Sequence, residues 1–119
     1  MNKKIASVFV FTLLMSVSAF AQKTAPADIE PLLKKHICLV CHKIDARLVG
    51  PAYEEVAKKK YTAEEIVELI YNPKPEHWAG YPAMAAMKQV PKDDALKIAK
   101  WINTLAGSPK KSSSKKKKA

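Results

Sequence analysis

The chain has 119 residues, with 21 Lys and Arg against 11 Asp and Glu, and a formal net charge of +10; its length is typical of one domain. The charge sits at the two ends, because residues 22–109 hold 13 basic and 11 acidic residues, a balance of +2. A nucleic-acid-binding domain would carry its basic residues on the folded part, so we expect no nucleic acid as partner. Residues 22–109 also lack Phe, and so small a core usually needs a cofactor, a metal or a disulfide.

Residues 1–21 have the features of a secretory signal peptide. Lys3 and Lys4 give a positive start, 5–20 is uncharged and mostly apolar, and Ala19-Phe20-Ala21 matches the small-x-small cleavage pattern. Cleavage after Ala21 would leave a soluble protein in the periplasm. The alternative is an uncleaved anchor, for which the apolar run is short of the roughly 20 residues of a bilayer span.

A short helix is predicted over 31–37, with Pro31 in its first turn. Cys38-Leu39-Val40-Cys41-His42 follows, and this C-x-x-C-H pattern is the attachment signature of c-type haem. Two thiols three positions apart can add to two vinyl groups on one side of the porphyrin. The histidine that follows is then held beneath the iron as its proximal ligand. We therefore predict one covalent haem c with its iron, bound through Cys38, Cys41 and His42.

Three other interpretations of the two cysteines are open. They could form a structural disulfide or a thioredoxin-like redox pair, although that pair belongs after a strand and the flanks here are helical. A zinc site would need four ligands, and only His36 and His77 remain as further donors.

The second axial position of the iron has few candidate ligands in the mature chain. Met84 and Met87 are its only methionines, and both lie in a Gly- and Pro-containing stretch predicted to be a loop. We favour Met84, because Pro82 stiffens the approach two residues earlier. Met87 and His77 stay as alternatives, and either methionine could instead only fill space beside the ring.

The remaining elements are predicted to be helices. One covers 52–59, after the Gly50-Pro51 break, and a second covers 63–71, where Thr62 and Glu65 form a capping box. Residues 72–90 form the methionine-bearing loop, and a last helix opens at Pro91 and stops before Gly107. No strand alternation is present. We predict an all-α fold of four to five short helices around one haem, with the first and last helices packed together.

The C-terminal segment, 110–119, carries six lysines and is predicted to be a disordered tail. It is either a solvated appendage or an electrostatic contact for an acidic redox partner or an anionic membrane surface. The expected domain boundaries are therefore 1–21, 22–109 and 110–119.

Taken together, these motifs resemble the small monohaem class I cytochromes c of bacteria, over roughly 29–106. The resemblance rests on the C-x-x-C-H motif and on four further stretches in the family's order: Val49-Gly50-Pro51-Ala52-Tyr53, Trp78, Pro82-Ala83-Met84, and Val90-Pro91 leading into Ala99-Lys100-Trp101-Ile102. It implies that the Pro51 carbonyl bonds the far nitrogen of His42, that Trp78 packs near a haem propionate, and that Met84 is the distal ligand. Here Ala85-Ala86 replace the prolines that usually follow that methionine.

The function implied by the resemblance is electron transfer, without a catalytic residue. The protein would act as a monomer and shuttle single electrons between periplasmic or membrane redox partners, such as a membrane oxidase or reductase. The alternative is a haem enzyme or gas sensor with a labile distal ligand. A second haem motif and a distal acid–base cluster, which would support that alternative, are missing from the sequence.

Overall fold

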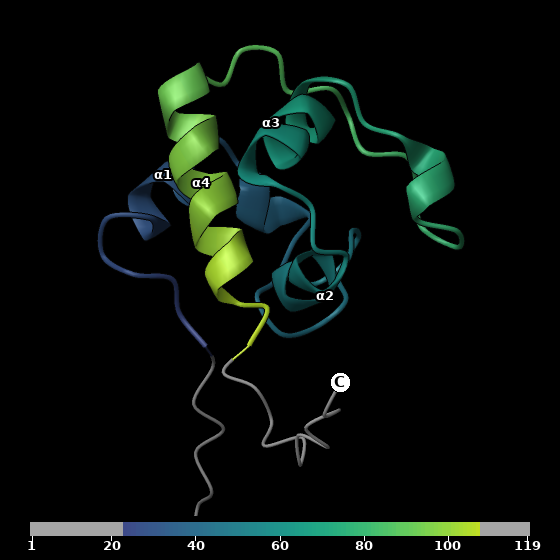
Figure 1. Cartoon of the computed structure of the whole chain (residues 1–119), viewed down its shortest axis with the longest axis horizontal. Helices are drawn as coiled ribbons and strands as arrows, with labels where there is room; N and C mark the ends of the chain where they lie inside the picture. Colours follow the sequence, from purple (N-terminus) through teal and green to yellow (C-terminus); the bar gives the residue numbers. More distant parts are fainter. Residues whose placement is uncertain (1–22, 108–119) are drawn as a thin grey trace, which may run out of the picture.

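The computed structural model describes residues 23–107, and these form a small bundle of short helices (Figure 1). The four α-helices are α1 (Glu30–Lys35), α2 (Tyr53–Lys58), α3 (Ala63–Tyr71) and α4 (Lys92–Thr104). Two 3₁₀ turns, η1 (Cys38–Val40) and η2 (Pro75–His77), complete the set. No strand occurs in this part of the chain, which confirms the all-α prediction.

Helix α4 is the longest element and packs against α1, α2 and α3. Figure 1 shows α1 behind α4, and the η2 turn at the far side of the molecule, where the long connection from α3 to α4 turns back. The predicted packing of the first helix against the last is therefore confirmed. The chain outside the helices wraps around one side of the bundle, and that side carries the site described below.

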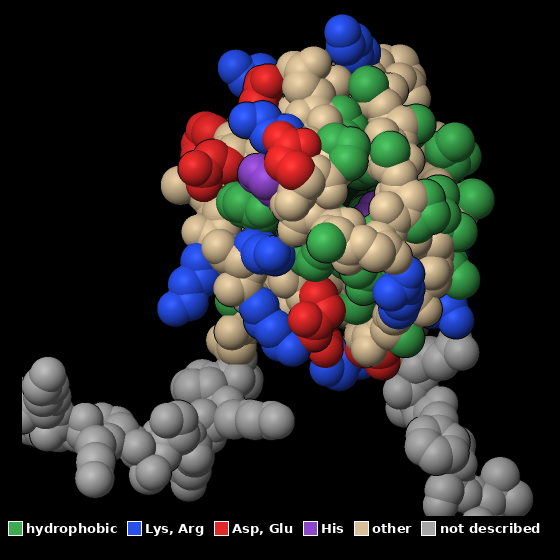
Figure 2. Space-filling model, turned by 90° about the vertical axis from the view of Figure 1, so that its right-hand side faces the viewer, with side chains coloured by type: hydrophobic (Ala, Val, Ile, Leu, Met, Phe, Trp, Pro, Cys, Tyr) green, Lys and Arg blue, Asp and Glu red, His purple; other side chains and the backbone are tan. Residues whose placement is uncertain are grey.

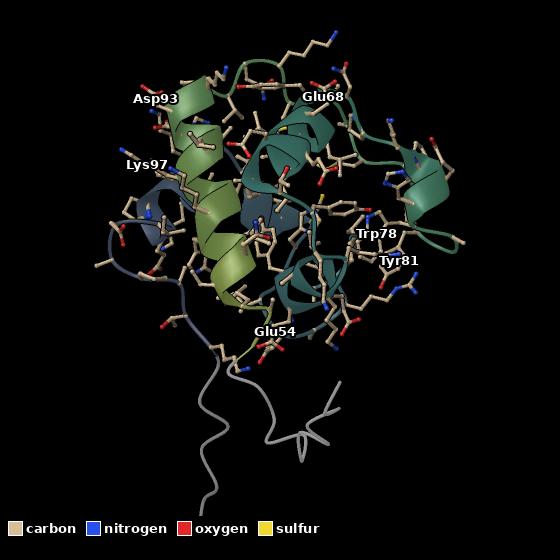
Figure 3. The ribbon with its side chains drawn as sticks, viewed as in Figure 1. Glu54, Glu68, Trp78, Tyr81, Asp93 and Lys97 are labelled. Carbon is tan, nitrogen blue, oxygen red and sulfur yellow. The ribbon has the colours of Figure 1, made fainter. Side chains whose placement is uncertain are left out.

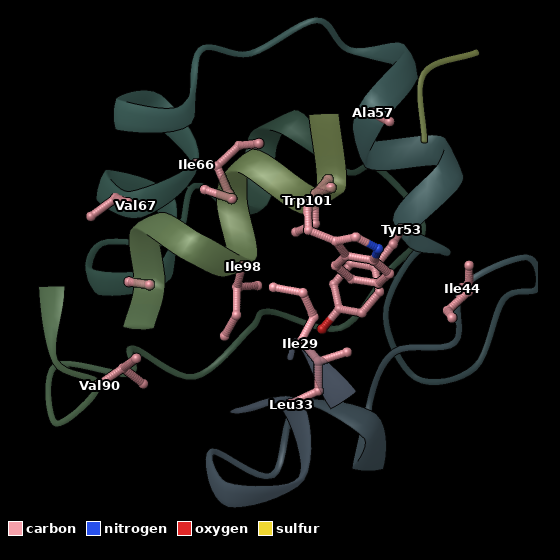
Figure 4. Packing of buried hydrophobic residues seen from close by; sticks show 13 residues of the cluster. Ile29, Leu33, Ile44, Tyr53, Ala57, Ile66, Val67, Val90, Ile98 and Trp101 are labelled. Carbon is pink, nitrogen blue, oxygen red and sulfur yellow. The ribbon is translucent and has the colours of Figure 1, made fainter. Parts of the chain in front are cut away.

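The core lies where α4 meets the other helices. Trp101 packs edge-on against Tyr53 of α2 with ring centroids 5.4 Å apart, and Leu33 of α1 and Ile98 of α4 are buried nearby (Figure 4). Every buried side-chain polar atom in 23–107 has a hydrogen-bond partner. The buried polar groups are thus all hydrogen-bonded, but the apolar core contains few large side chains.

Helix α3 begins and ends where the sequence predicts. Thr62 accepts a hydrogen bond from the backbone N–H of Glu65 at 3.1 Å, and the Glu65 carboxylate accepts one from the Thr62 N–H at 2.7 Å. This reciprocal pair satisfies two of the free N–H groups at the helix start. The helix then presents Ile66 and Val67 to the core.

The other boundaries differ from the prediction by one or more residues. Helix α1 ends at Lys35 rather than at residue 37, because Ile37 has left-handed backbone angles (φ 54°, ψ 22°) that cannot continue a right-handed helix. The loop predicted over 72–90 contains the η2 turn, which has Pro75 in its first position. The last helix ends at Thr104, three residues before Gly107.

Helices α1 and α4 are also joined by a polar contact. His36 is 8% exposed, and its Nε2 lies 2.9 Å from Oδ2 of Asp94. The same oxygen accepts a hydrogen bond from Lys35 at 3.3 Å. The sequence places His36 on the apolar side of the first helix and the acidic pair at the start of the last, but it does not predict that the two meet.

Within 23–107, no helix combines the length and apolar character that crossing a bilayer requires. The predicted signal peptide and lysine tail lie outside the described residues.

Candidate functional site

The C-x-x-C-H motif folds into a tight turn at the edge of the bundle. The backbone N–H of Cys41 bonds to the Cys38 carbonyl at 3.2 Å, and the N–H of His42 bonds to the same carbonyl at 3.0 Å. This turn brings both sulfurs and the imidazole to the wall of one cavity. Cys38 and Cys41 are half-buried free thiols, and burial raises the pKa of the Cys38 thiol.

The imidazole of His42 is held by a backbone carbonyl. Its Nδ1 lies 2.7 Å from the oxygen of Pro51, as the resemblance implies. A carbonyl can only accept, so Nδ1 carries the proton and Nε2 keeps its lone pair. Burial lowers the pKa of His42, and the Pro51 bond opposes that shift only in part. The ring is therefore neutral at pH 7 and able to donate Nε2 to a metal.

Two neighbours pack closely on the same ring. Tyr53 stacks on it, with centroids 5.0 Å apart and an interplanar angle of 18°. Gly50 lies so close that an added Cβ would be 2.6 Å from Cε1 and 3.0 Å from Nδ1 of His42. A side chain at position 50 would therefore collide with the imidazole. The sequence analysis identifies Gly50 only as a break in the chain. The Gly-Pro pair that comes shortly after a histidine ligand is the sequence signal from which this close contact could have been predicted.

The cavity in front of His42 has a volume of about 380 Å³. Protein interiors rarely leave voids much larger than a water molecule, and binding pockets begin at about 300 Å³. The walls are mainly apolar and come from residues 37–56, from α3, from the long connection between α3 and α4, and from α4 itself. In Figure 2, hydrophobic side chains gather along one edge of the face shown. The cavity therefore suits a large, mostly apolar group.

Both candidate methionines line this cavity. Met84 is 41% exposed. Met87 packs against the core, its N–H bonds the Ile70 carbonyl at 2.9 Å, and its sulfur accepts a hydrogen bond from Gln89 at 3.7 Å. Both thioethers therefore lie in the cavity wall. Met84 is partly exposed, whereas Met87 is held to α3 by its backbone hydrogen bond to Ile70.

His77, the third candidate for the distal position, is not among the cavity-lining residues. Its Nδ1 lies 2.9 Å from the Tyr61 hydroxyl, and the two rings stack with centroids 5.8 Å apart. This contact holds the side chain against Tyr61. The ring of His77 is thus engaged with Tyr61 and stands outside the cavity wall, which favours the two methionines as candidates for the distal position.

Two cations fix the loop that carries Trp78. The guanidinium of Arg47 lies 4.0 Å from the Tyr81 ring centroid and donates to the Gly80 carbonyl at 2.6 Å. Lys59 lies 4.7 Å from the Trp78 ring centroid. Figure 3 shows Trp78 and Tyr81 close together between the η2 turn and α2. Sequence reasoning missed Arg47 and Lys59, since the pairing of a cation with a distant ring has no local sequence signal.

The chemistry of the donors fits haem better than zinc. No group of three or more His, Cys, Asp or Glu side chains able to hold a metal ion occurs between residues 23 and 107. What the cavity offers is one neutral imidazole, thioether sulfurs and apolar walls, with two thiols at one side. That set matches the needs of a covalently attached haem.

Comparison with known proteins agrees with this chemistry. The chain is 35% identical over 97 residues to cytochrome c-551 of Pseudomonas aeruginosa, covering 78% of this chain and 91% of the relative. It is 32% identical over 75 residues to cytochrome c-552 of Hydrogenobacter thermophilus, covering 61% of this chain and 76% of that protein. No protein-family model matches the chain.

The fold agrees as well. The crystal structure of Nitrosomonas europaea cytochrome c552 is similar with a TM-score of 0.59 and 32% identity, over 63% of this chain and 96% of that one. Sequence, cavity chemistry and fold therefore lead to the same conclusion: the chain belongs to the small monohaem class I cytochromes c of bacteria, electron-transfer proteins with one covalently attached haem c.

Proposed function

We propose that Cys38 and Cys41 hold the haem through thioether bonds, and that His42 and Met84 are its axial ligands. The observation that carries this assignment is the 2.7 Å hydrogen bond between Nδ1 of His42 and the Pro51 carbonyl. It fixes the tautomer in which Nε2 is the free donor atom, and it orients the ring, which is how an outer hydrogen bond supports a ligating histidine. Met84 is supported by its place in the cavity wall and by Pro82 upstream.

The bound iron supplies the redox chemistry, one electron taken up or given away between the ferric and ferrous states. The protein's own residues supply the surroundings. Pro51 holds the imidazole, the apolar walls keep water from the cavity, and Arg47 and Lys59 fix the loop that carries Trp78. We place Trp78 beside a haem propionate, since the indole lines the same cavity. If His42 and Met84 hold the haem in both oxidation states, little rearrangement would accompany the transfer of an electron.

We infer that the protein is a carrier and not an enzyme. The named relatives are electron-carrier cytochromes. Two methionines line the cavity, which favours a filled sixth position over the labile distal site that a haem enzyme or gas sensor needs.

We further infer export to the periplasm, with residues 1–21 removed after Ala21 and 22–109 forming the haem domain. Covalent haem attachment takes place outside the bacterial cytoplasm, and the positive start and apolar run of 1–21 fit an export signal. The partners are then redox proteins of the periplasm or membrane, and the protein works as a monomer. We propose that the lysines of 110–119 attract an acidic partner or an anionic surface.

The test is covalent haem in the purified protein. After acid extraction in denaturant, the protein should keep its haem, and its mass should exceed that of the chain from Gln22 by one haem group. A double variant, Cys38→Ser with Cys41→Ser, should lose the haem under the same extraction. A colourless wild-type protein with a Cys38–Cys41 disulfide would contradict the proposal.

A further inference from the structure

The loop that carries Met84 is held at two points, one on each side of the methionine. After it, the Met87 N–H bonds a carbonyl in the last turn of α3 at 2.9 Å. Before it, the Gly80 carbonyl accepts a hydrogen bond from the guanidinium of Arg47 at 2.6 Å. Between these points, no backbone–backbone hydrogen bond joins residues 82–86 to the rest of 23–107. The position of the methionine therefore depends on the two anchors.

The two anchors differ in what supplies them. The anchor at Met87 is a bond between backbone groups, which does not depend on any one side chain. The anchor at Gly80 is a single side chain from 33 positions earlier in the chain, in the segment that follows His42. Gly80 has a φ of 82° at a turn, a conformation that glycine adopts without strain. Arg47 thus holds the loop at the turn through which the chain approaches Met84.

The guanidinium of Arg47 makes a second contact with the same turn. It lies 4.0 Å from the centroid of the Tyr81 ring, within the range of a cation–π interaction. Tyr81 in turn meets Trp78 edge-on, with ring centroids 5.9 Å apart and an interplanar angle of 84°. A planar guanidinium can stack on a ring and donate to a carbonyl at once, and a lysine ammonium does not reproduce this geometry. Arg47 is not among the residues that line the cavity, so its contacts reach the site only through the loop.

We propose that Arg47 is a positioning residue for the distal methionine: by holding the turn at Gly80 and Tyr81, it keeps the Met84 sulfur at the iron and slows its release. The inference rests on the proposed function, because it takes Met84 as an axial ligand. It follows that a small external ligand, which can bind only after the thioether has left, gains access at a rate that depends on Arg47.

The test measures the binding of imidazole to the ferric holoprotein, at a pH where imidazole is neutral. Arg47→Met keeps an unbranched side chain and removes both contacts. We expect the association rate to rise about three- to tenfold, a factor that matches the loss of about one hydrogen bond. The weak red-edge absorption of methionine-bound ferric haem should fade at a lower temperature in Arg47→Met than in wild type. The unfolding midpoint of the helices, followed by circular dichroism, should stay the same.

Three further variants separate the loop contact from other effects. Lys43→Met removes an exposed charge from the same segment but leaves both Arg47 contacts in place, so it should bind imidazole at the wild-type rate. Arg47→Lys keeps the charge and a donor but loses the stacking on Tyr81, so its rate should lie between those of wild type and Arg47→Met. Arg47→Met combined with Met84→Ala should bind imidazole no faster than Met84→Ala alone, because no thioether is left to release.

Three results would overturn the proposal. The first is a wild-type association rate in Arg47→Met. The second is an equal increase in Arg47→Met and Lys43→Met, which would mean that only the charge matters. The third is the same increase from Arg47→Met with and without the Met84 thioether, which would mean that Arg47 controls entry to the cavity and not the methionine. A wild-type holoprotein without the red-edge absorption, or a Met84→Ala protein that keeps it, would instead refute the proposed ligation.

Discussion

At the residue scale, the imidazole of His42 is positioned by three local contacts. The Pro51 carbonyl binds Nδ1 at 2.7 Å, Tyr53 stacks on the ring, and the bare Cα of Gly50 leaves room for it. Burial raises the pKa of the Tyr53 phenol well above its usual value of 10, so this neighbour is neutral at any ordinary pH. The ring is thus confined by uncharged groups, and its orientation depends on shape and on one hydrogen bond.

Gly50→Ala should disturb this arrangement directly. The new Cβ would lie 2.6 Å from Cε1, so the ring or the 49–51 backbone must move and the bond to Pro51 must lengthen. We expect a loss of stability of about 1–3 kcal/mol, the usual range for overpacking, and shifted NMR resonances of the His42 ring. Gly80→Ala is the control, since its Cβ would meet nothing within 4 Å although φ is +82°. It should be destabilising but leave the His42 resonances unchanged.

The two methionines can be separated by mutation. Met84→Ala should abolish the weak red-edge absorption of methionine-bound ferric haem and lower the reduction potential, because the thioether stabilises the ferrous state. Met87→Ala should leave both nearly intact while lowering stability, since Met87 packs on the core. The opposite pattern in the spectra would transfer the ligand role to Met87.

At the scale of elements, the contact between α1 and α4 has an ionic component. The hydrogen bond from His36, with help from Lys35, lowers the pKa of the Asp94 carboxyl below 3.8. A carboxyl whose pKa falls on folding contributes stability above its unfolded pKa and loses it as the pH drops toward the folded value.

Asp94→Asn should therefore lower the unfolding midpoint at pH 7, and the difference from wild type should shrink as the pH falls below about 4. Asp93→Asn is the matched control, because Asp93 is exposed in the same first turn and has no ion pair among the described residues. It should change the midpoint little at any pH. Equal pH profiles for wild type and Asp94→Asn would show that the contact is only steric.

At the scale of the whole molecule, the cavity is large for so small a protein. Its volume of about 380 Å³ lies beside a core that contains one Trp and one Tyr among its buried aromatic residues. Without the haem, the apolar walls would face water. A covalently held group that contacts only the native state makes its contribution to stability permanent.

Chain produced without haem attachment should accordingly be largely unfolded. Far-ultraviolet circular dichroism should show little helix, and heating should give no cooperative transition. The holoprotein under the same conditions is the control. A helical apoprotein that melts cooperatively would show that the helices in 23–107 sustain the fold alone.

The lysine tail is testable by deletion of 110–119, which removes six positive charges. Spectrum and potential should barely change. Electron transfer to an acidic partner should slow at low salt and converge with the full-length rate as salt rises, because exposed charges are screened beyond roughly 10 Å at 0.1 M. Identical rates for both proteins at every ionic strength would identify the tail as a solvated appendage.

The sequence by itself determined the features whose signals lie within a few residues. The spacing of Cys38, Cys41 and His42 predicts the haem attachment site. Thr62 and Glu65 specify the start of α3, and the apolar periods specify an all-α fold. Each depends on atoms that the chain keeps close in any compact conformation, so no knowledge of distant packing is required.

Only the tertiary structure decided which distant groups meet. Asp94 pairs with His36 across 58 positions, His77 is held by Tyr61 and so leaves the cavity wall, and Ile37 is turned left-handed by the junction of α1 with η1. These outcomes follow from how short helices pack around a large cavity. Periodicity and capping signals describe single helices or strands. They carry no information about which residues of one element contact another element.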